Sequence, residues 1–419
     1  MAQLPGVTLR PAQDGDLSQI VNLDRLAFSP LSSNEEIERD WFHGAIALPG
    51  RKLFLAVDDT TGQGVGGYAQ IDFDIWFEGQ TFPAMGLAAV AVAPHRRGQR
   101  VARLMLEHAL KIGKEQHLPL MTLYPFQHGF YRKLGWAWVE RTYQYRVSTH
   151  HIPAFKERTN ILPYNPSQQQ ALQSVYEKAA AQHNGWFQRR PWQWEDKLKT
   201  GNGREIYSYS EAGELQGYLI LQFAYLEPPY KVLAVVVQEW IALTASAYRG
   251  ILGFLGSLRD QVSTVVWNTF PEDIFPHLLK EQRRDPALPS TSFEFGITHR
   301  FGEIGGGFMW RLVDLERAFE LRSIRPGATF ALSFQVTDPV FGERAIAAEF
   351  ANNRIINLKE SPVNTLKTSI EHLTELFFGV RRATDLLWMG EIEYEGDPTL
   401  LQKLDTAWQA TPPFCWDFF

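Results

Sequence analysis

The predicted fold rests on one stretch of the chain, Val90-Ala-Val-Ala-Pro-His-Arg-Arg-Gly-Gln-Arg-Val-Ala102. It begins inside an almost uncharged apolar run, residues 85–93, which is typical of a buried strand. Pro94 ends that run, and a basic turn containing Gly98 follows. Apolar residues then recur at helical spacing over residues 101–116. The stretch therefore predicts a strand that a short basic turn joins to an amphipathic helix.

The turn itself has the features of a phosphate site. Backbone N–H groups in the first turn of a helix lack partners and carry a partial positive charge, so they bind anions. Gly98 allows the backbone to approach a pyrophosphate closely. Arg96, Arg97 and Arg100 add charged donors. Basic turns that contact only water are also common, so the turn alone leaves both interpretations open.

Strands and helices alternate on both sides of this stretch. The predicted strands are residues 7–10, 53–57, 66–71, 85–93, 120–124 and 139–147. The predicted helices are residues 17–23, residues 101–116 and a short one ending near Gly135. This alternation predicts an α/β or α+β domain that ends near residue 150.

The rest of the chain predicts two further domains. Residues 152–166 contain three prolines and are expected to be a linker. Beyond it we expect helices at 167–182 and 246–261 and strands at 218–224, 233–241 and 262–268, without a second basic glycine turn. After Gly305-Gly-Gly307 we expect strands at 309–313 and 329–336 and helices at 314–321, 369–377 and 399–410. Three domains follow, at residues 1–150, 151–304 and 305–419.

Composition narrows the class of protein. Hydrophobic residues make up 45% and charged residues 21%, the balance of a folded chain. A net charge of −6 gives no general attraction to nucleic acid or anionic membranes. Cys415 is the only cysteine, which excludes an intrachain disulfide and zinc sites made of paired cysteines. With no secretory signal and no apolar run of about 18 residues, we expect a soluble, cytoplasmic protein without nucleic-acid or membrane partners.

Several motifs carry a family resemblance. The segment His95-Arg-Arg-Gly-Gln-Arg100 resembles the acyl-coenzyme A signature of the GCN5-related N-acetyltransferase (GNAT) superfamily, Gln/Arg-x-x-Gly-x-Gly/Ala, but departs from it at His95 and Arg100. An Arg-Arg-Gly turn without a second glycine, followed by Phe130-Tyr-Arg-Lys-Leu-Gly-Trp136, resembles the Eis (enhanced intracellular survival) acetyltransferases. Met309-Trp-Arg-Leu-Val-Asp-Leu-Glu-Arg-Ala318 is similar to the start of that group's sterol-carrier-like domain, and Trp416-Asp-Phe-Phe419 to its ending.

The resemblance implies an α+β fold and a substrate pair. It implies two tandem acetyltransferase-like domains, the second without the cofactor turn, followed by a sterol-carrier-like domain. It also implies acetyl-coenzyme A as the acetyl donor, an amine-bearing small molecule as the acceptor, no metal, and a homohexamer. The donor-binding residues that it implies are Val90, Ala91 and Val92 for the pantetheine arm, Arg97, Gly98, Gln99, Arg100, Val101 and Ala102 for the pyrophosphate, and Phe126 and Gln127 beyond the next strand.

Two catalytic groups follow from the same resemblance. Tyr131 is expected to act as the general acid that protonates the leaving thiolate; the alternative is a core tyrosine beside Phe130. An alkyl amine has a pKa of about 10.4, so a base must also accept a proton. By resemblance that base is the C-terminal carboxylate of Phe419. Here the alternative is an apolar tail that anchors the end of the chain.

The acceptor and some further residues stay open. We expect a cationic acceptor, aminoglycoside-like or a polyamine; the alternatives are a protein lysine or N-terminal amine, or a non-catalytic acyl-coenzyme A- or lipid-binding protein. Trp41 and Phe42 are candidates to line an amine pocket. Asp72 and Asp74 alternate with apolar residues, as surface positions on a strand do.

Overall fold

The computed structural model describes residues 4–43, 46, 48–225, 233–282, 301–327 and 329–419. The chain forms two compact units. Unit 1 comprises Met1–Val139, Phe308–Pro412 and Phe418–Phe419; unit 2 comprises Glu140–Gly307 and Pro413–Asp417. No helix within the described ranges is long and apolar enough to cross a membrane.

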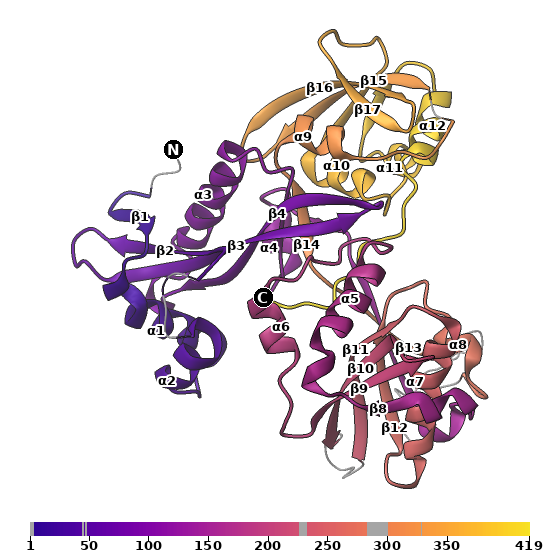
Figure 1. Ribbon diagram of the computed structural model, residues 1–419. Helices are drawn as coiled ribbons and strands as arrows, with labels where there is room; N and C mark the ends of the chain where they lie inside the picture. Colours follow the sequence, from indigo (N-terminus) through magenta and orange to yellow (C-terminus); the bar gives the residue numbers. More distant parts are fainter. Residues whose placement is uncertain (1–3, 44–45, 47, 226–232, 283–300, 328) are drawn as a thin grey trace, which may run out of the picture. The chain divides into compact units, whose positions relative to one another are not determined.

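The first sheet, in unit 1, has seven strands in the order β1-β2-β3-β4-β5-β14-β6. Its strands are β1 (Val7–Pro11), β2 (Arg51–Asp58), β3 (Gly64–Phe77), β4 (Gln80–Val92), β5 (Leu120–Leu123), β6 (Ala137–Trp138) and β14 (Met309–Leu312). The helices beside it are α1 (Leu17–Phe28), α2 (Asn34–Ile37), α3 (Val101–Glu115) and α4 (His128–Arg132). Figure 1 shows α3 on one side of this sheet and α1 with α2 on the other, and two separate apolar clusters fill the two faces.

Among the first five strands of the sheet, the pairing changes once from antiparallel to parallel. β1, β2, β3 and β4 pair antiparallel, whereas β4 and β5 pair parallel from Ala84↔Leu120 to Leu87↔Leu123. Helix α3 makes the crossover that such a parallel pair requires. The strand, basic turn and helix predicted from residues 85–116 are therefore confirmed.

Strand β14 corrects the sequence-based assignment of residues 309–313 to the third domain. It lies between β5 and β6 and pairs antiparallel with both. Its residues are fully buried, including Arg311, whose guanidinium donates to the Leu134 carbonyl at 2.8 Å and to Asp338 at 2.6 Å. Which strands lie next to each other is decided here by pairing between segments far apart in sequence. The local sequence pattern carries no information about that pairing.

The second sheet, in unit 2, has the order β13-β7-β12-β11-β10-β9-β8. Its strands are β7 (Arg141–Ser148), β8 (Ile161–Pro163), β9 (Arg204–Glu211), β10 (Glu214–Tyr225), β11 (Leu233–Ala242), β12 (Thr264–Thr269) and β13 (Gly302–Gly306). The strand predicted at 139–147 thus belongs to this sheet rather than to the first. Residues 161–163 of the expected linker form strand β8. The sequence analysis did not predict strand β9. Two glycines of the run at 305–307 belong to strand β13.

The two sheets share one plan. Four antiparallel strands lead to a parallel pair, β11 with β12, and the next strand again comes from a distant part of the chain. After β11 the chain enters α7 (Ala245–Ser257), but Thr244 accepts a hydrogen bond from the Ala247 N–H and caps that helix. The first turn of α7 therefore has its own acceptor, and the basic glycine turn has no counterpart there.

A buried ionic cluster holds unit 2 together around Arg189, which lies after α5 (Gln169–Ala180) and before α6 (Pro191–Lys197). Its guanidinium donates to Glu239 at 2.9 Å and to Asp417 at 2.9 Å, and Lys197 lies 2.8 Å from Glu239. Burial alone would raise the pKa of Glu239, but the two cations outweigh burial and hold it below its usual value. Removing one partner of such a cluster leaves an uncompensated buried charge. The cluster therefore fixes Asp417, two residues from the end of the chain.

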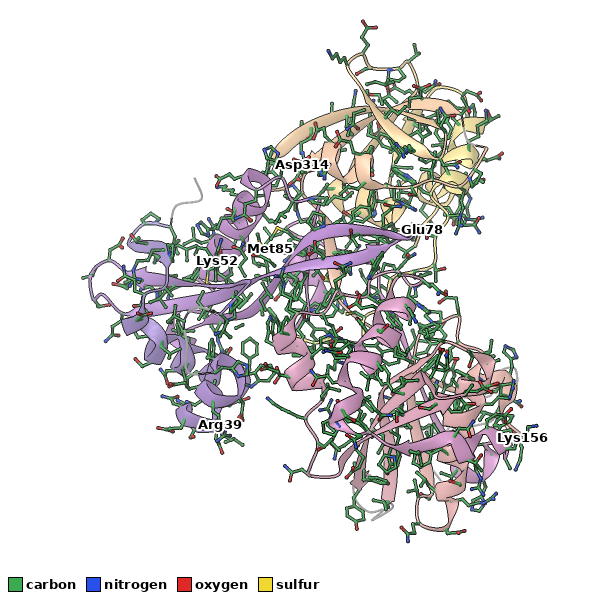
Figure 2. All side chains as sticks on the ribbon, in the orientation of Figure 1. Arg39, Lys52, Glu78, Met85, Lys156 and Asp314 are labelled. Carbon is green, nitrogen blue, oxygen red and sulfur yellow. The ribbon has the colours of Figure 1, made fainter. Side chains whose placement is uncertain are left out.

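The C-terminal part of unit 1 contains the third sheet, in the order β17-β16-β15-β18-β19. Its strands are β15 (Phe330–Asp338), β16 (Gly342–Ala351), β17 (Arg354–Leu358), β18 (Thr365–Ser369) and β19 (Glu393–Glu395); its helices are α9 (Leu315–Leu321), α10 (Ile370–Phe377), α11 (Ala383–Trp388) and α12 (Thr399–Ala407). Aromatic rings fill its core: Phe334 stacks on Trp408, and Phe377 packs edge-on against Trp408. Figure 2 labels Glu78, at the tip of the β3–β4 hairpin, and Glu78 lies 3.7 Å from Arg325 of this part.

Candidate active site

The candidate site begins where β4 extends beyond the last residue that pairs with β5. Pairing between these strands stops at Leu87, and β4 continues to Val92. On the β3 side the register slips between Ala91 and Ala88, a bulge in which Ala89 adopts a left-handed φ of 49°. Within the part of the chain that the structure describes, residues 90–92 have no strand partner on the β5 side. Their backbone groups on that side are placed to pair with an extended ligand, as those of an edge strand are.

The basic turn leads directly from this edge into α3. Gly98 has φ of 78°, and a side chain there would meet nothing within 4 Å. Arg100 also adopts a left-handed conformation, φ 66°, at the position where the superfamily signature has a second small residue. No side chain caps α3 and no acidic residue lies in its first turn. Its first N–H groups thus face the turn beside the exposed Arg97 and Arg100, which suits an anion.

Arg96 does not join this group. Its guanidinium forms an ion pair at 2.6 Å with Asp58, at the end of β2. Arg96 is therefore held by a partner from the β2–β3 turn, and its role as a third charged donor stays a prediction. Gln99 is exposed and its side chain donates to the His95 carbonyl.

Tyr131 lies in α4, on the same face of the sheet as α3. Its side chain is 3% exposed and belongs to the cluster that contains Met105 and Leu123. Phe126, 67% exposed, packs edge-on against its ring at 5.5 Å. Burial raises the pKa of Tyr131 well above its usual value, so the hydroxyl keeps its proton at neutral pH. Among the described residues none bonds to that hydroxyl, which leaves it available as a donor.

A glycine fixes the end of α4. Gly135 adopts φ of 81°, and its N–H donates to the Arg132 carbonyl while the Trp136 N–H donates to the Tyr131 carbonyl. This is how a glycine just beyond a helix ends it. The glycine of the motif Phe130–Trp136 therefore sets where the helix that carries Tyr131 stops.

The last residue of the chain lies against the other face of the same sheet. The Phe419 ring stacks on Phe308 at 4.9 Å and packs against Phe73 at 4.7 Å. It sits on Gly86, where an added Cβ would lie 2.6 Å from the Phe419 Cε2. Met85 faces α3, and neighbouring strand residues point to opposite faces, so Gly86 faces α1. The strand edge at 90–92 thus lies between a sheet face carrying Tyr131 and one carrying the chain end.

The two aromatic residues that we expected to line an amine pocket, Trp41 and Phe42, lie in different surroundings. Phe42 is buried in the cluster between α1 and the sheet, with the Arg51 guanidinium 5.7 Å from its ring, so it is a core residue. Trp41 is 51% exposed, and its ring lies 6.4 Å from that of Phe418. Phe418 also lies 5.1 Å from Tyr124, which follows β5.

One notable residue escaped the sequence analysis. Asp24, in α1, is 7% exposed, and among the described residues none pairs with its carboxylate. Burial raises its pKa from 3.8 to about 6. Asp16, at the start of the same helix, is also buried but has two hydrogen bonds from Arg10, at 2.6 and 3.0 Å. The sequence offered one signal, an acidic residue on the apolar face of α1. The described residues contain no group of three or more metal-ligating side chains.

Comparisons with protein families cover the chain in three segments. Residues 8–139 and residues 185–311 each match an acetyltransferase (GNAT) domain, and residues 315–416 match a sterol carrier protein domain. The chain is therefore two tandem GNAT domains followed by a sterol-carrier-like domain.

Individual relatives agree with this organisation. N-acetyltransferase Eis of Mycobacterium tuberculosis and that of Mycobacterium bovis are each 23% identical over 377 residues, covering 86% of this chain and 87% of theirs. A GCN5-related N-acetyltransferase from Anabaena variabilis superposes with a TM-score of 0.82 at 21% identity, over 99% of this chain and 100% of that one. Eis1 from Mycobacterium abscessus superposes with a TM-score of 0.75 at 18% identity, over 99% and 100%.

The contact between Gly86 and the chain end gives the first prediction. Gly86→Ala places a methyl group where the rings of Phe419 and Phe73 lie, and such overpacking costs about 1–3 kcal/mol. We expect carboxypeptidase A to release Phe419 about tenfold faster from this variant, as followed by mass spectrometry. Gly15→Ala, where an added Cβ meets nothing within 4 Å, is the matched control. Equal release from Gly86→Ala and the wild type would contradict the packing.

The second prediction concerns the carboxylate of Asp24, which has no partner among the described residues. Because burial raises its pKa from 3.8 to about 6, the folded protein binds this proton more tightly than the unfolded chain does. The charged form therefore destabilises the fold fully above pH 6 and not at all below about pH 4. Asp24→Asn should raise the free energy of unfolding by about 2 kcal/mol at pH 8, measured by urea denaturation, with little effect at pH 4. An equal gain at both pH values would show that the charge is not its source.

Proposed function

We propose that this chain, which contains two GNAT domains and is similar to the Eis N-acetyltransferases, transfers the acetyl group of acetyl-coenzyme A to an amine of a cationic small molecule, aminoglycoside-like or a polyamine. The observation that carries the proposal is the continuous path from the unpaired edge of β4 into the uncapped, basic start of α3. The second GNAT domain lacks that start, because Thr244 caps the corresponding helix.

The donor site fits a long ligand with a charged end. Val90, Ala91 and Val92 would pair through their backbone with the amides of the pantetheine arm, as a neighbouring strand does. Residues 97–102 would bind the pyrophosphate through the first N–H groups of α3 and the side chains of Arg97 and Arg100. Phe126 and Gln127, both exposed after β5, would contact the arm near its reactive end. The bound donor supplies the thioester that carries the acetyl group.

Tyr131 would complete the transfer from the α3 face of the sheet. In the reaction the nitrogen–carbonyl bond forms, the carbon–sulfur bond breaks, and the sulfur needs a proton. Its raised pKa keeps the Tyr131 hydroxyl protonated, and no described residue competes for that donor. A protonated hydroxyl with no competing acceptor among the described residues can donate the proton that the sulfur needs.

The opposite face would supply the base. The proton that leaves the amine needs an acceptor, and we assign it to the carboxylate of Phe419, directly or through a water molecule. A free α-carboxyl group has a pKa of about 3.3–3.7. Phe73 and Phe308 contact the ring of Phe419 and so hold the end of the chain against this face of the sheet.

Exposed aromatic rings support a cationic acceptor. Trp41, Phe418 and Tyr124 form a chain of rings, each about half exposed, next to the last residue. Aromatic faces attract ammonium groups. A protein lysine or N-terminal amine remains the alternative acceptor. The homohexamer and the cytoplasmic location implied by the resemblance are also part of the proposal.

The C-terminal domain gives little support to a lipid-carrier function. Aromatic rings packed around Trp408 fill its core. A pocket of about 720 Å³ in this domain is lined in part by charged side chains, among them Arg381, Arg382 and Asp405. A sterol or acyl chain needs an apolar cavity instead.

The proposal is tested by thiol release from acetyl-coenzyme A, with kanamycin, spermidine and a lysine peptide offered separately. We expect rapid release with kanamycin or spermidine. Release only with the peptide would move the acceptor to the protein class. No release with any of the three, while coenzyme A still binds, would overturn the transferase assignment for these acceptors.

The role of Tyr131 is tested by Tyr131→Phe. The loss of one donor to the sulfur should lower kcat about 10²- to 10⁴-fold, the usual contribution of a general acid. Calorimetry should find the affinity for coenzyme A unchanged within about threefold, because the ring and its packing remain. Retention of full turnover would place the proton donor elsewhere.

The role of the chain end is tested by adding two glycines after Phe419. The extension moves the carboxylate but leaves the Phe419 ring its contacts, so we expect kcat to fall about tenfold or more. A two-glycine extension at the N-terminus is the control for added length. Unchanged kcat in the C-terminally extended protein would exclude the terminal carboxylate as the base.

A further inference from the structure

The strands β11 and β12 of the second GNAT domain diverge in the same way as β4 and β5 of the first. Pairing between β11 and β12 ends at Val237, but β11 continues to Ala242. On the β10 side the register slips between Val237 and Glu239, as it does at the bulge of β4. Within the described part of the chain, residues 239–242 have no strand partner on the β12 side. The second domain therefore has its own opening between two diverging strands.

The C-terminal segment of the chain, residues 413–417, packs at this opening and belongs to the same unit. Trp240 of β11 stacks on Phe270, the residue that follows β12, with ring centres 5.7 Å apart. Of the C-terminal segment, Trp416 packs edge-on against Trp240 at 6.0 Å, and Phe414 packs edge-on against Phe270 at 5.7 Å. The segment therefore contacts both strands where they diverge.

Polar contacts hold the two ends of this segment. The Phe414 N–H donates to the Asn184 carbonyl at 3.0 Å. At the other end, the Arg189 guanidinium donates to the Asp417 carboxylate at 2.9 and 3.0 Å. The same guanidinium donates to Glu239, from the unpaired end of β11, at 2.9 Å. A buried ionic contact thus links the free part of β11 to the end of the segment.

A glycine gives the segment the room that it needs. Gly185 adopts φ of 88°, and an added Cβ would lie 2.9 Å from the Pro413 Cβ and 3.0 Å from the Phe414 nitrogen. Gly213, in the same domain, adopts φ of 83°, and an added Cβ there would meet nothing within 4 Å. Alanine at either position strains the backbone to a similar degree. The two substitutions therefore differ in whether they displace residues 413–417.

We propose that the opening between β11 and β12 is the docking site of residues 413–417, and that this docking positions the terminal carboxylate. The inference rests on the proposed function, in which the carboxylate of Phe419 is the base. Two residues of chain span at most about 7 Å, so holding Asp417 restricts where Phe419 can lie. Arg189 and Gly185 act through the segment, as positioning residues. The second domain then serves the reaction as the anchor of the chain end.

The test compares Gly185→Ala with Gly213→Ala in the full-length protein, first by digestion with carboxypeptidase A, which needs no turnover. We expect Phe419 to be released about tenfold faster from Gly185→Ala than from Gly213→Ala, because a displaced segment frees the chain end more often. Mass spectrometry follows the release.

The second readout is thiol release with the best acceptor. In Gly185→Ala we expect kcat to fall about tenfold or more relative to Gly213→Ala, because a displaced base loses its alignment with the reacting amine. The KM for acetyl-coenzyme A should stay within about twofold, because the proposed donor site lies in the first domain. A general loss of folded protein would not depend on which glycine is replaced.

Asp417→Asn is the second variant, for the case that Gly185→Ala does not fold. It removes the charge that Arg189 holds but leaves Glu239 on that guanidinium. We expect both readouts to change in the same direction as in Gly185→Ala. Asp260→Asn, an exposed acid of the same domain, is its control for net charge.

Equal release of Phe419 from Gly185→Ala and Gly213→Ala would overturn the inference, as would equal kcat values. The protein with two glycines added after Phe419 separates this failure from that of the proposed function. If that extension lowers kcat and Gly185→Ala does not, the positioning role is wrong. If the extension leaves kcat unchanged, the terminal carboxylate is not the base, and the positioning of a base falls with it, whereas the rate of Phe419 release still decides the docking.

Discussion

The place where two parallel strands stop pairing governs the whole candidate site. β4 and β5 share four residue pairs, after which β4 continues with a bulge at Ala89 and β5 ends. Longer pairing would cover the edge at residues 90–92 with a strand of the protein itself. Because it stops, an extended ligand can take the place of that strand. The α3 turn, Tyr131 and Phe419 gain their proposed roles from their positions around this edge.

The sequence predicted what depends on local pattern. Residues 85–116 combine an apolar run, a proline, a glycine turn and a helical period, and each of these acts over a few residues. The position of β14 depends instead on which distant edge an apolar segment joins, and its local pattern does not record that choice. Arg96 shows the same limit at one side chain, because its partner Asp58 comes from another turn. The sequence analysis did not identify Asp24 as a buried acid. Helical periodicity shows that a residue faces inward, but it does not show whether the fold places a hydrogen-bonding partner beside it.

The two GNAT domains show how little of the chemistry lies in the fold. Both sheets contain four antiparallel strands, a parallel pair and a strand from elsewhere in the chain. The first domain leaves the start of its crossover helix uncapped and places arginines beside it, whereas the second closes that position with the hydroxyl of Thr244. One threonine side chain thus occupies one of the N–H donors that a phosphate would need. Function in this architecture resides in such local differences.

The origin of β14 has a consequence for how the protein is made. Thr122 of β5 bonds to the Met309 carbonyl across a separation of 187 residues. At roughly 5–20 residues per second, a ribosome needs roughly 10–40 s to synthesise that interval. Throughout it, the edge of β5 has no β14 to pair with, and an open edge invites association with other chains. All strands of the second sheet precede β14 in the chain, so the sheet that begins the protein is the later of the two to receive its last strand.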